Sequence, residues 1–140
     1  MNRFFATAAA LIFTARAIAC DGLVVSDAWV REAPPGASVM AAYATLKNGG
    51  TKPIKLEGAS GADFGSVEMH RTVMQDGTMR MLAETSLPLP PGASVKFEPG
   101  GLHLMLFDPS RALKAGDKTA LSLLCGKSAT KVEFNVRAGQ

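Results

Sequence analysis

From residue 22 onward, hydrophobic and polar positions follow the two-residue alternation of β-strands, and no helical stripe stands out. In residues 131–137, for example, Val132, Phe134 and Val136 alternate with polar side chains. Similar short apolar and β-branched runs recur along the chain, separated by Gly, Pro, Asn and Asp. The predicted strands are 23–25, 28–31, 40–47, 54–58, 66–74, 78–82, 94–97, 103–107, 119–124 and 131–136.

Strands this short and this regularly interrupted indicate an all-β fold, an antiparallel sandwich or small barrel. Residues 111–116 have room for one helical turn and no more. A chain of 140 residues without an internal repeat fits a single domain, which we place at 20–140.

Residues 1–19 have the pattern of a secretory signal peptide. Arg3 precedes the apolar stretch 4–15, and Ala17-Ile18-Ala19 has the small-x-small pattern of a cleavage site. The stretch is shorter than the roughly 20 apolar residues that a membrane-spanning helix needs, so a retained anchor is the lesser alternative. Cys20 raises a lipoprotein alternative, although the preceding residues lack the Leu and Gly usual in a lipobox. We therefore predict an exported, periplasmic protein without stable membrane insertion after cleavage.

Charge and composition exclude some classes of protein. A hydrophobic content of 47% rules out a disordered chain. Loss of Arg3 and Arg16 with the leader lowers the formal charge from +3 to +1, and no basic stripe with interleaved aromatics is present, so nucleic acid is not a candidate partner. Cys20 and Cys125 allow either one disulfide or two unpaired thiols, and the sequence does not choose between them.

The two histidines of the chain both stand beside methionines. His70 lies in a segment, 69–81, that holds four of the seven Met, and His103 is followed by Met105. Asp76-Gly77 is a strong signal for a two-residue hairpin turn, which would pair residues whose numbers sum to 153. Met74 then faces Met79, and Met81 lies diagonal to His70 on the same face.

Two imidazoles and two thioethers would form an uncharged, soft site if the strand holding His103 packs near this hairpin. Thioether ligands favour Cu(I) over zinc, calcium or magnesium. The competing interpretation is that the methionines are core fillers, which we adopt for Met40 and prefer for Met74 and Met79, with a reserve role of those two in binding or shielding the ion. For His70, Met81, His103 and Met105, which we call the candidate ligand set, the residues alone leave metal binding and packing equally open.

The spacing of the candidate ligand set resembles that of a known family. The four residues reproduce the motif H-x10-M-x21-H-x-M of the periplasmic PCuAC-type copper chaperones. The flanking segments are also similar, namely Val67-Glu68-Met69-His70, Gly77-Thr78-Met79-Arg80-Met81, Pro99-Gly100-Gly101-Leu102-His103-Leu104-Met105-Leu106, Ala28-Trp29-Val30-Arg31, Pro34-Pro35-Gly36, Ala42-Tyr43 and Asn48-Gly49-Gly50. Similarity covers residues 24–137, whereas Cys20 and Cys125 depart from the family pattern.

The resemblance implies a cupredoxin-like Greek-key β-barrel with an exposed copper site at one edge. It implies that Cu(I) is bound by His70, Met81, His103 and Met105. It further implies a copper carrier, not an enzyme, which passes copper to the copper site of cytochrome c oxidase or to a thioredoxin-like Sco-type partner. We expect the carrier to be a monomer.

Other function classes fit the residues less well. A blue-copper electron carrier needs a Cys thiolate with two His, and both histidines of this chain lie upstream of Cys125. No Ser/His/acid or Cys/His grouping supports hydrolysis. A copper-independent ligand-binding or adhesion-type sandwich, in which the methionines only pack, remains the alternative.

Overall fold

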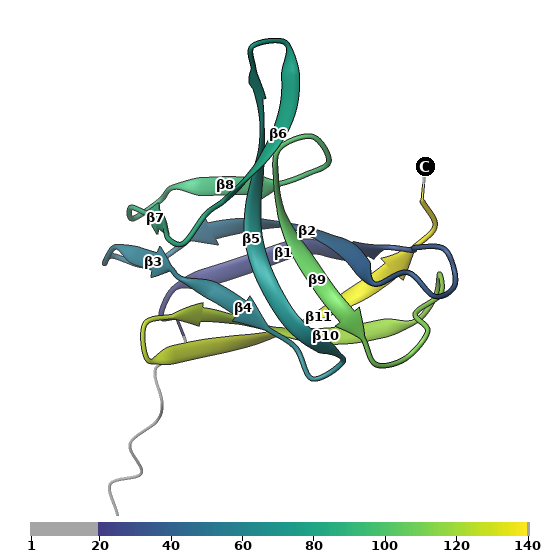
Figure 1. The fold of residues 1–140 in the computed structure, drawn as a ribbon. Helices are drawn as coiled ribbons and strands as arrows, with labels where there is room; N and C mark the ends of the chain where they lie inside the picture. Colours follow the sequence, from purple (N-terminus) through teal and green to yellow (C-terminus); the bar gives the residue numbers. More distant parts are fainter. Residues whose placement is uncertain (1–19, 140) are drawn as a thin grey trace, which may run out of the picture.

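The computed structural model describes residues 20–139, which form an all-β domain (Figure 1). The predicted signal peptide at 1–19 lies outside the described residues. The eleven strands are β1 (Leu23–Arg31), β2 (Val39–Asn48), β3 (Ile54–Leu56), β4 (Gly58–Ser60), β5 (Phe64–Gln75), β6 (Thr78–Ala83), β7 (Leu87–Leu89), β8 (Ser94–Phe97), β9 (Leu102–Pro109), β10 (Lys118–Cys125) and β11 (Ser128–Arg137). This part of the chain contains no helix of the length and hydrophobicity that a membrane span requires.

Nine of these strands form one sheet that closes on itself. Its order is β4-β10-β11-β1-β2-β8-β9-β5-β6, and β4 also pairs with β5, while β2 also pairs with β9. Closure leaves β6 outside the ring, paired only with β5. Most pairings are antiparallel, but β1 with β11 and β8 with β9 are parallel. The predicted cupredoxin-like barrel is therefore confirmed, with mixed rather than purely antiparallel pairing.

The barrel interior is filled by side chains from one side of the strands in the ring. On β2 the residues Met40, Ala42, Ala44 and Leu46 are buried, and they alternate with residues that face outward. On β9 the even-numbered residues 102, 104 and 106 likewise join the core. Met40 belongs to the core cluster and is only 5% exposed, which confirms its predicted packing role.

Strand boundaries differ from the predicted ones at identifiable positions. The two runs predicted at 23–31 form one strand, β1, which is interrupted only by an irregularity between Ser26 and Trp29. The run 54–58 is divided between β3, which pairs with β7, and β4, which pairs with β10. The sequence did not predict β7, because Pro88 lies at its centre and Pro is disfavoured within strands.

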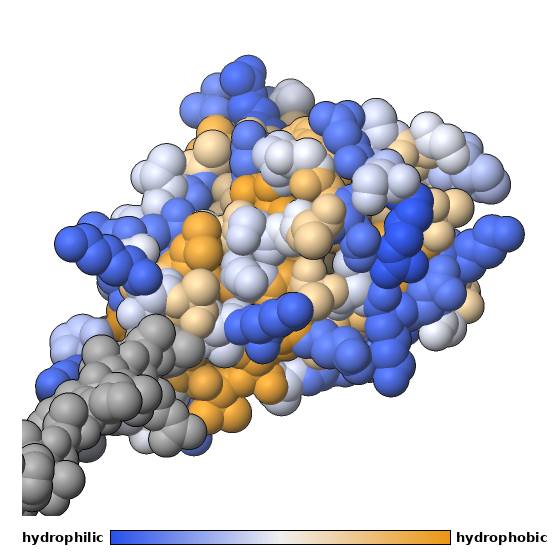
Figure 2. Space-filling model, turned by 90° about the horizontal axis from the view of Figure 1, so that it is seen from below, coloured by the Kyte–Doolittle hydropathy of each residue, from blue (hydrophilic) through white to orange (hydrophobic). Residues whose placement is uncertain are grey.

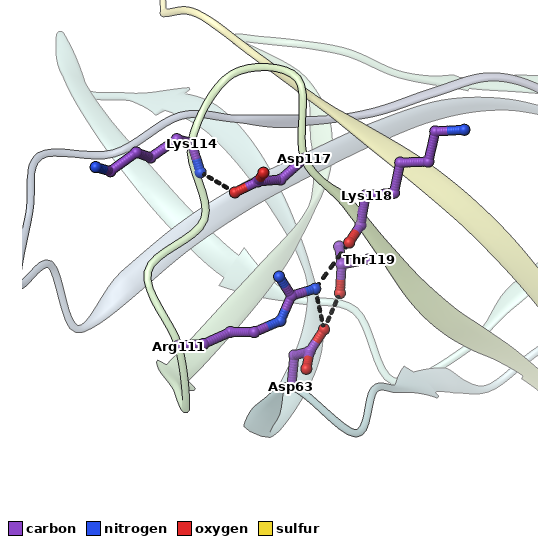
Figure 3. Close-up of polar contacts among 6 residues, drawn as sticks. All are labelled: Asp63, Arg111, Lys114, Asp117, Lys118 and Thr119. Carbon is purple, nitrogen blue, oxygen red and sulfur yellow. Dashed lines mark hydrogen bonds and ion pairs between the residues drawn. The ribbon is translucent and has the colours of Figure 1, made fainter.

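The connection between β9 and β10 contains a β-turn where the sequence left room for a helical turn. The Asp117 N–H donates to the carbonyl of Lys114, and the Lys114 N–H donates to Oδ2 of Asp117 at 2.8 Å. Nearby, Asp63 Oδ2 accepts hydrogen bonds from Arg111 Nη2 at 3.0 Å and from Thr119 Oγ1 at 2.7 Å (Figure 3). The guanidinium and the hydroxyl hold the pKa of Asp63 below its ordinary value. We call this group the Asp63 clamp, because it ties the β4–β5 loop to the β9–β10 connection.

The β5–β6 hairpin extends beyond the barrel (Figure 1). Asp76 and Gly77 have φ of 51° and 75°, the positive values of a type I′ turn, which matches the twist of paired strands. The opposite end of the molecule shows small apolar patches divided by hydrophilic side chains (Figure 2). Three of the five large hydrophobic side chains that are exposed in the described residues lie on the hairpin face, namely Met74, Met79 and Met81.

Cys20 and Cys125 form a disulfide, with Cα atoms 5.5 Å apart. It joins the first described residue to the last residue of β10. Of the two alternatives that the sequence left open, the structure contains the disulfide, so residues 20–139 hold no free thiol.

Candidate metal centre

The hairpin brings His70 and Met81 to one face. The register of β5 and β6 pairs His70 with Ala83, Thr72 with Met81 and Met74 with Met79, as the Asp76-Gly77 turn predicted. Met81 therefore lies diagonal to His70 across the two strands. Met69 points to the other face, as predicted, and it is buried.

The second histidine joins this face through a pairing that is distant in sequence. Strand β9 lies against β5 with His103 directly opposite His70 and Met105 directly opposite Glu68. Residues two apart on a strand share a face, so both His–Met pairs occupy the outer surface of the same three-stranded segment. The condition that the sequence left open, that the strand holding His103 packs beside the hairpin, is therefore met.

The two imidazole rings are neighbours, and each has one nitrogen held by a hydrogen bond. Their centroids are 5.9 Å apart. His70 Nε2 lies 2.8 Å from Glu68 Oε2, and His103 Nδ1 lies 3.0 Å from the Gly101 carbonyl oxygen. Both partners only accept hydrogen bonds, so the neutral rings carry their protons on these nitrogens.

The remaining ring nitrogens, His70 Nδ1 and His103 Nε2, are buried and have no hydrogen-bond partner. A buried polar atom without a partner is uncommon, because leaving it unsatisfied costs about 1–3 kcal/mol. Each of these nitrogens has a free lone pair in the neutral tautomer that its neighbour selects. This arrangement is the one that metal-binding histidines adopt, with the far nitrogen fixed by a carboxylate or a carbonyl.

A hollow of about 370 Å³ lies beside the rings and exposes the methionines. Its lining includes two arginines, Arg31 and Arg80, together with His103, Met105, Met81, Met79, Ala41 and Tyr43. Ala41 pairs with Met105, and its small side chain leaves space on the outer face. His70 adjoins this hollow through His103 without lining it. Exposure differs among the four candidates, from 4% for His103 to 59% for Met81.

The candidate ligand set consists of soft donors and is nearly neutral in charge. Glu68 is the acidic side chain in contact with the rings. Residues 20–139 contain no group of three or more His, Cys, Asp or Glu that could hold a metal ion. Hard divalent cations prefer oxygen ligands, so this arrangement favours a soft ion instead.

Three contributors to the site were not identified from the sequence. Glu68 orients His70, and the period-two rule could have indicated it, because it lies two residues earlier on the same face. The Gly101 carbonyl accepts from both His103 and the Thr72 N–H, which ties the β8–β9 loop to the hairpin. Tyr43 lines the hollow, where it is brought by long-range strand pairing that no local pattern indicates.

Comparison with known proteins gives the class first. The copper-bound PCuAC domain of PmoF2 superimposes with a TM-score of 0.72 and 26% identity, over 86% of this chain and 97% of that domain. The Cu(I) form of DR1885 from Deinococcus radiodurans gives 0.61 and 28% identity, over 85% of this chain and 80% of that one. A cupredoxin-like barrel with outward histidines and methionines thus defines a domain of the PCuAC class, which confirms the resemblance.

The family follows from a match to residues 23–138. That family is described as "Putative lipoprotein LpqE-like", and the chain belongs to it. A relative from Leifsonia xyli subsp. xyli, "Putative lipoprotein Lxx21020", is 35% identical over 104 residues, which is 74% of this chain. The match spans 61% of the length of that relative.

Proposed function

We propose that this protein is a periplasmic copper chaperone that binds one Cu(I) through His70, Met81, His103 and Met105. The observation that carries the proposal is the pair of buried, unpartnered ring nitrogens beside two thioethers on one sheet face. The copper-bound state of the similar PmoF2 domain and the Cu(I) state of DR1885 support copper as the cargo.

The ligand chemistry supports transport rather than electron transfer. A blue-copper site needs a thiolate, and both cysteines of the described chain are joined in the disulfide. The family is of a copper-chaperone type rather than an enzyme class. Met81, which is 59% exposed, gives an acceptor a ligand that it can displace first.

For the acceptor, we propose the copper site of cytochrome c oxidase or a thioredoxin-like Sco-type protein. Transfer would proceed by stepwise exchange, in which an acceptor ligand replaces Met81 before the buried His103 releases the ion. Copper stays Cu(I) throughout, so the exchange needs no oxidant or reductant. We propose a monomer as the carrying form, since the acceptor must reach the exposed edge.

An anaerobic Cu(I) titration of residues 20–140 against a coloured Cu(I) chelator tests the binding proposal. We expect one tightly bound copper per parent chain and loss of this tight binding in His103→Ala/Met105→Ala. The matched control is Met40→Leu/Met69→Leu, which removes two thioethers from the core and should leave binding unchanged, since Met-to-Leu changes are well tolerated. Circular dichroism checks the fold of each variant.

The competing proposal is a copper-independent ligand-binding or adhesion-type sandwich. It predicts that the parent binds no copper, or that parent and His103→Ala/Met105→Ala bind equally. Either result would overturn the chaperone proposal. Delivery is tested separately by mixing the Cu(I) protein with a copper-free, reduced oxidase copper domain, to which copper should move.

A further inference from the structure

We propose that Met74, Met79 and Met81 form a second, outer Cu(I) site at the exposed end of the hairpin, which captures copper and passes it to the candidate ligand set. The inference rests on the proposed function and extends it with an entry route. It assigns a role to two methionines that the motif does not include.

The strand register places the three thioethers together. Met74 and Met79 are direct cross-strand partners, and Met81 is the next residue along the same face of β6. In a hairpin with a two-residue turn, the pair next to the turn is hydrogen-bonded, so Met74 and Met79 form a non-hydrogen-bonded pair, whose side chains lie closer. Their Cβ atoms are then about 4.5–5.5 Å apart. Because methionine has three rotatable bonds, the sulfurs can converge on one ion.

Packing does not explain these side chains. Met74 is 66% exposed, Met79 is 65% exposed and Met81 is 59% exposed, and the hairpin that holds them stands outside the closed ring. The sequence favoured packing for Met74 and Met79, and their exposure makes that assignment wrong. Three flexible thioethers in water bury little apolar surface, but they are the neutral, soft ligands that Cu(I) prefers.

The proposed outer site is continuous with the hollow of the candidate metal centre. Met79 and Met81 both line that hollow, together with His103 and Met105. Met74 does not line the hollow, but it lies directly opposite Met79 across the two strands. The methionines therefore form a row from the hairpin end to the buried imidazole, in which Met81 belongs to both sites.

Shared ligation gives a direct route for transfer. Cu(I) held by three thioethers would keep Met81 while Met105 and the two imidazoles replace Met79 and Met74. Three neutral ligands join and two neutral ligands leave, so neither the charge of the ion nor its oxidation state changes. The inner site gains two imidazole donors and burial, which makes it the final position.

Methionine methyl NMR on protein labelled with ¹³C at the Met ε-carbon tests the outer site. In His70→Ala/His103→Ala, which disables the inner site, added Cu(I) should still shift the methyl signals of Met74, Met79 and Met81. Adding Met74→Leu/Met79→Leu should abolish that binding. If the histidine variant does not fold, the same signals are followed in His103→Ala/Met105→Ala, which also disables the inner site and leaves Met74, Met79 and Met81 in place.

Uptake kinetics give a second readout. Met74→Leu/Met79→Leu keeps the apolar surface and the inner ligands, so its final copper affinity should equal that of the parent. Its rate of Cu(I) uptake from the chelator complex should fall by roughly tenfold, which is about 1.4 kcal/mol in barrier. Met40→Leu/Met69→Leu should take up copper at the parent rate.

An unchanged rate of Cu(I) uptake, together with Met74 and Met79 methyl signals that do not shift on adding Cu(I), would overturn the proposal of an outer site. That result would leave the proposed function intact, provided that the parent still binds copper through its histidines. A parent without histidine-dependent copper would instead refute the proposed function, whatever Met74 and Met79 do.

Discussion

Individual hydrogen bonds determine what the two imidazoles can do. The Glu68 carboxylate and the Gly101 carbonyl each hold one ring nitrogen and leave the other buried and unpartnered. The accepting groups select opposite tautomers, with the proton on Nε2 of His70 and on Nδ1 of His103. The orientation of the two imidazoles is therefore fixed before any ion arrives, which lowers the entropic cost of binding.

Removal of the Glu68 carboxylate should weaken copper binding without unfolding the protein. We expect Glu68→Ala to lower Cu(I) affinity by about 10- to 100-fold, the range for partners that orient metal-binding histidines. Competition with a Cu(I) chelator measures the change. Glu57→Ala, at an exposed ion pair with Lys55, is the control. Equal affinities of the two variants would show that Glu68 does not orient a ligand.

Oxidation of the exposed thioethers should also weaken binding. Peroxide should convert Met81 to the sulfoxide well before Met69, since the two residues are 59% and 2% exposed. The sulfoxide is a harder donor, so Cu(I) affinity should fall, and methionine sulfoxide reductase should restore it. Peptide mass spectrometry follows each site. Unchanged copper binding by protein oxidised at Met81 and Met105 would contradict the ligand assignment.

At the scale of elements, one turn and one long-range pairing build the site. The type I′ turn sets the β5–β6 register, and the β5–β9 register sets His103 opposite His70. The Gly101 carbonyl accepts hydrogen bonds from His103 on β9 and Thr72 on β5, and so joins the β8–β9 loop to both strands. A change of one residue in either register would turn the ligands to the opposite face.

Gly77→Ala should destabilise the hairpin. Its φ of 75° is left-handed, and a side chain there costs about 1–2 kcal/mol even though the surrounding space is open. Thermal unfolding and chelator competition should show a lower melting temperature and weaker Cu(I) binding. Gly49→Ala is the matched control, because a Cβ there meets its neighbours at ordinary contact distances of 3.5 Å and its φ is not left-handed. Equal losses in both variants would argue against a special role of the turn.

The Asp63 clamp should make stability depend on acid pH. Because Arg111 and Thr119 lower the pKa of Asp63 from 3.8, its stabilisation is fully present above that value and is lost as pH falls through the folded-state pKa. Urea unfolding at neutral pH and near pH 3 measures this loss. Asp63→Asn should be less stable than the parent at neutral pH, and the difference should shrink in acid. A constant difference would contradict the assignment.

At the scale of the whole molecule, the closed barrel and the disulfide stabilise the fold at positions away from the candidate ligand set. Closure places the core inside the ring and the candidate ligands outside it. The disulfide lies at the end of β10, on a strand that takes no part in the site. The protein can therefore expose soft ligands at one edge without opening its core.

Cys20→Ser/Cys125→Ser should reduce stability and leave copper binding unchanged. The disulfide joins residues 105 positions apart, and removing such a crosslink costs about 2–5 kcal/mol. Chemical unfolding measures the loss, and chelator competition checks the site. A large fall in Cu(I) affinity of the folded variant would show that the two regions are coupled.

Local patterns predicted much of this molecule, and the remainder depends on long-range pairing. Alternation located most strands, and Asp76-Gly77 was sufficient to place Met81 near His70. The position of β9 beside β5 is not encoded in any local segment, and neither is the acceptor for each imidazole. The cysteine pairing was open for the same reason, because it depends on where the barrel closes.

X-ray absorption at the copper edge of protein loaded anaerobically with slightly less than one equivalent of Cu(I) tests the central claim most directly. The proposed set predicts a first shell of two nitrogen and two sulfur donors, which should lose nitrogen in His103→Ala and sulfur in Met105→Leu. A shell of nitrogen and oxygen alone, or one that neither substitution changes, would contradict copper binding by His70, Met81, His103 and Met105.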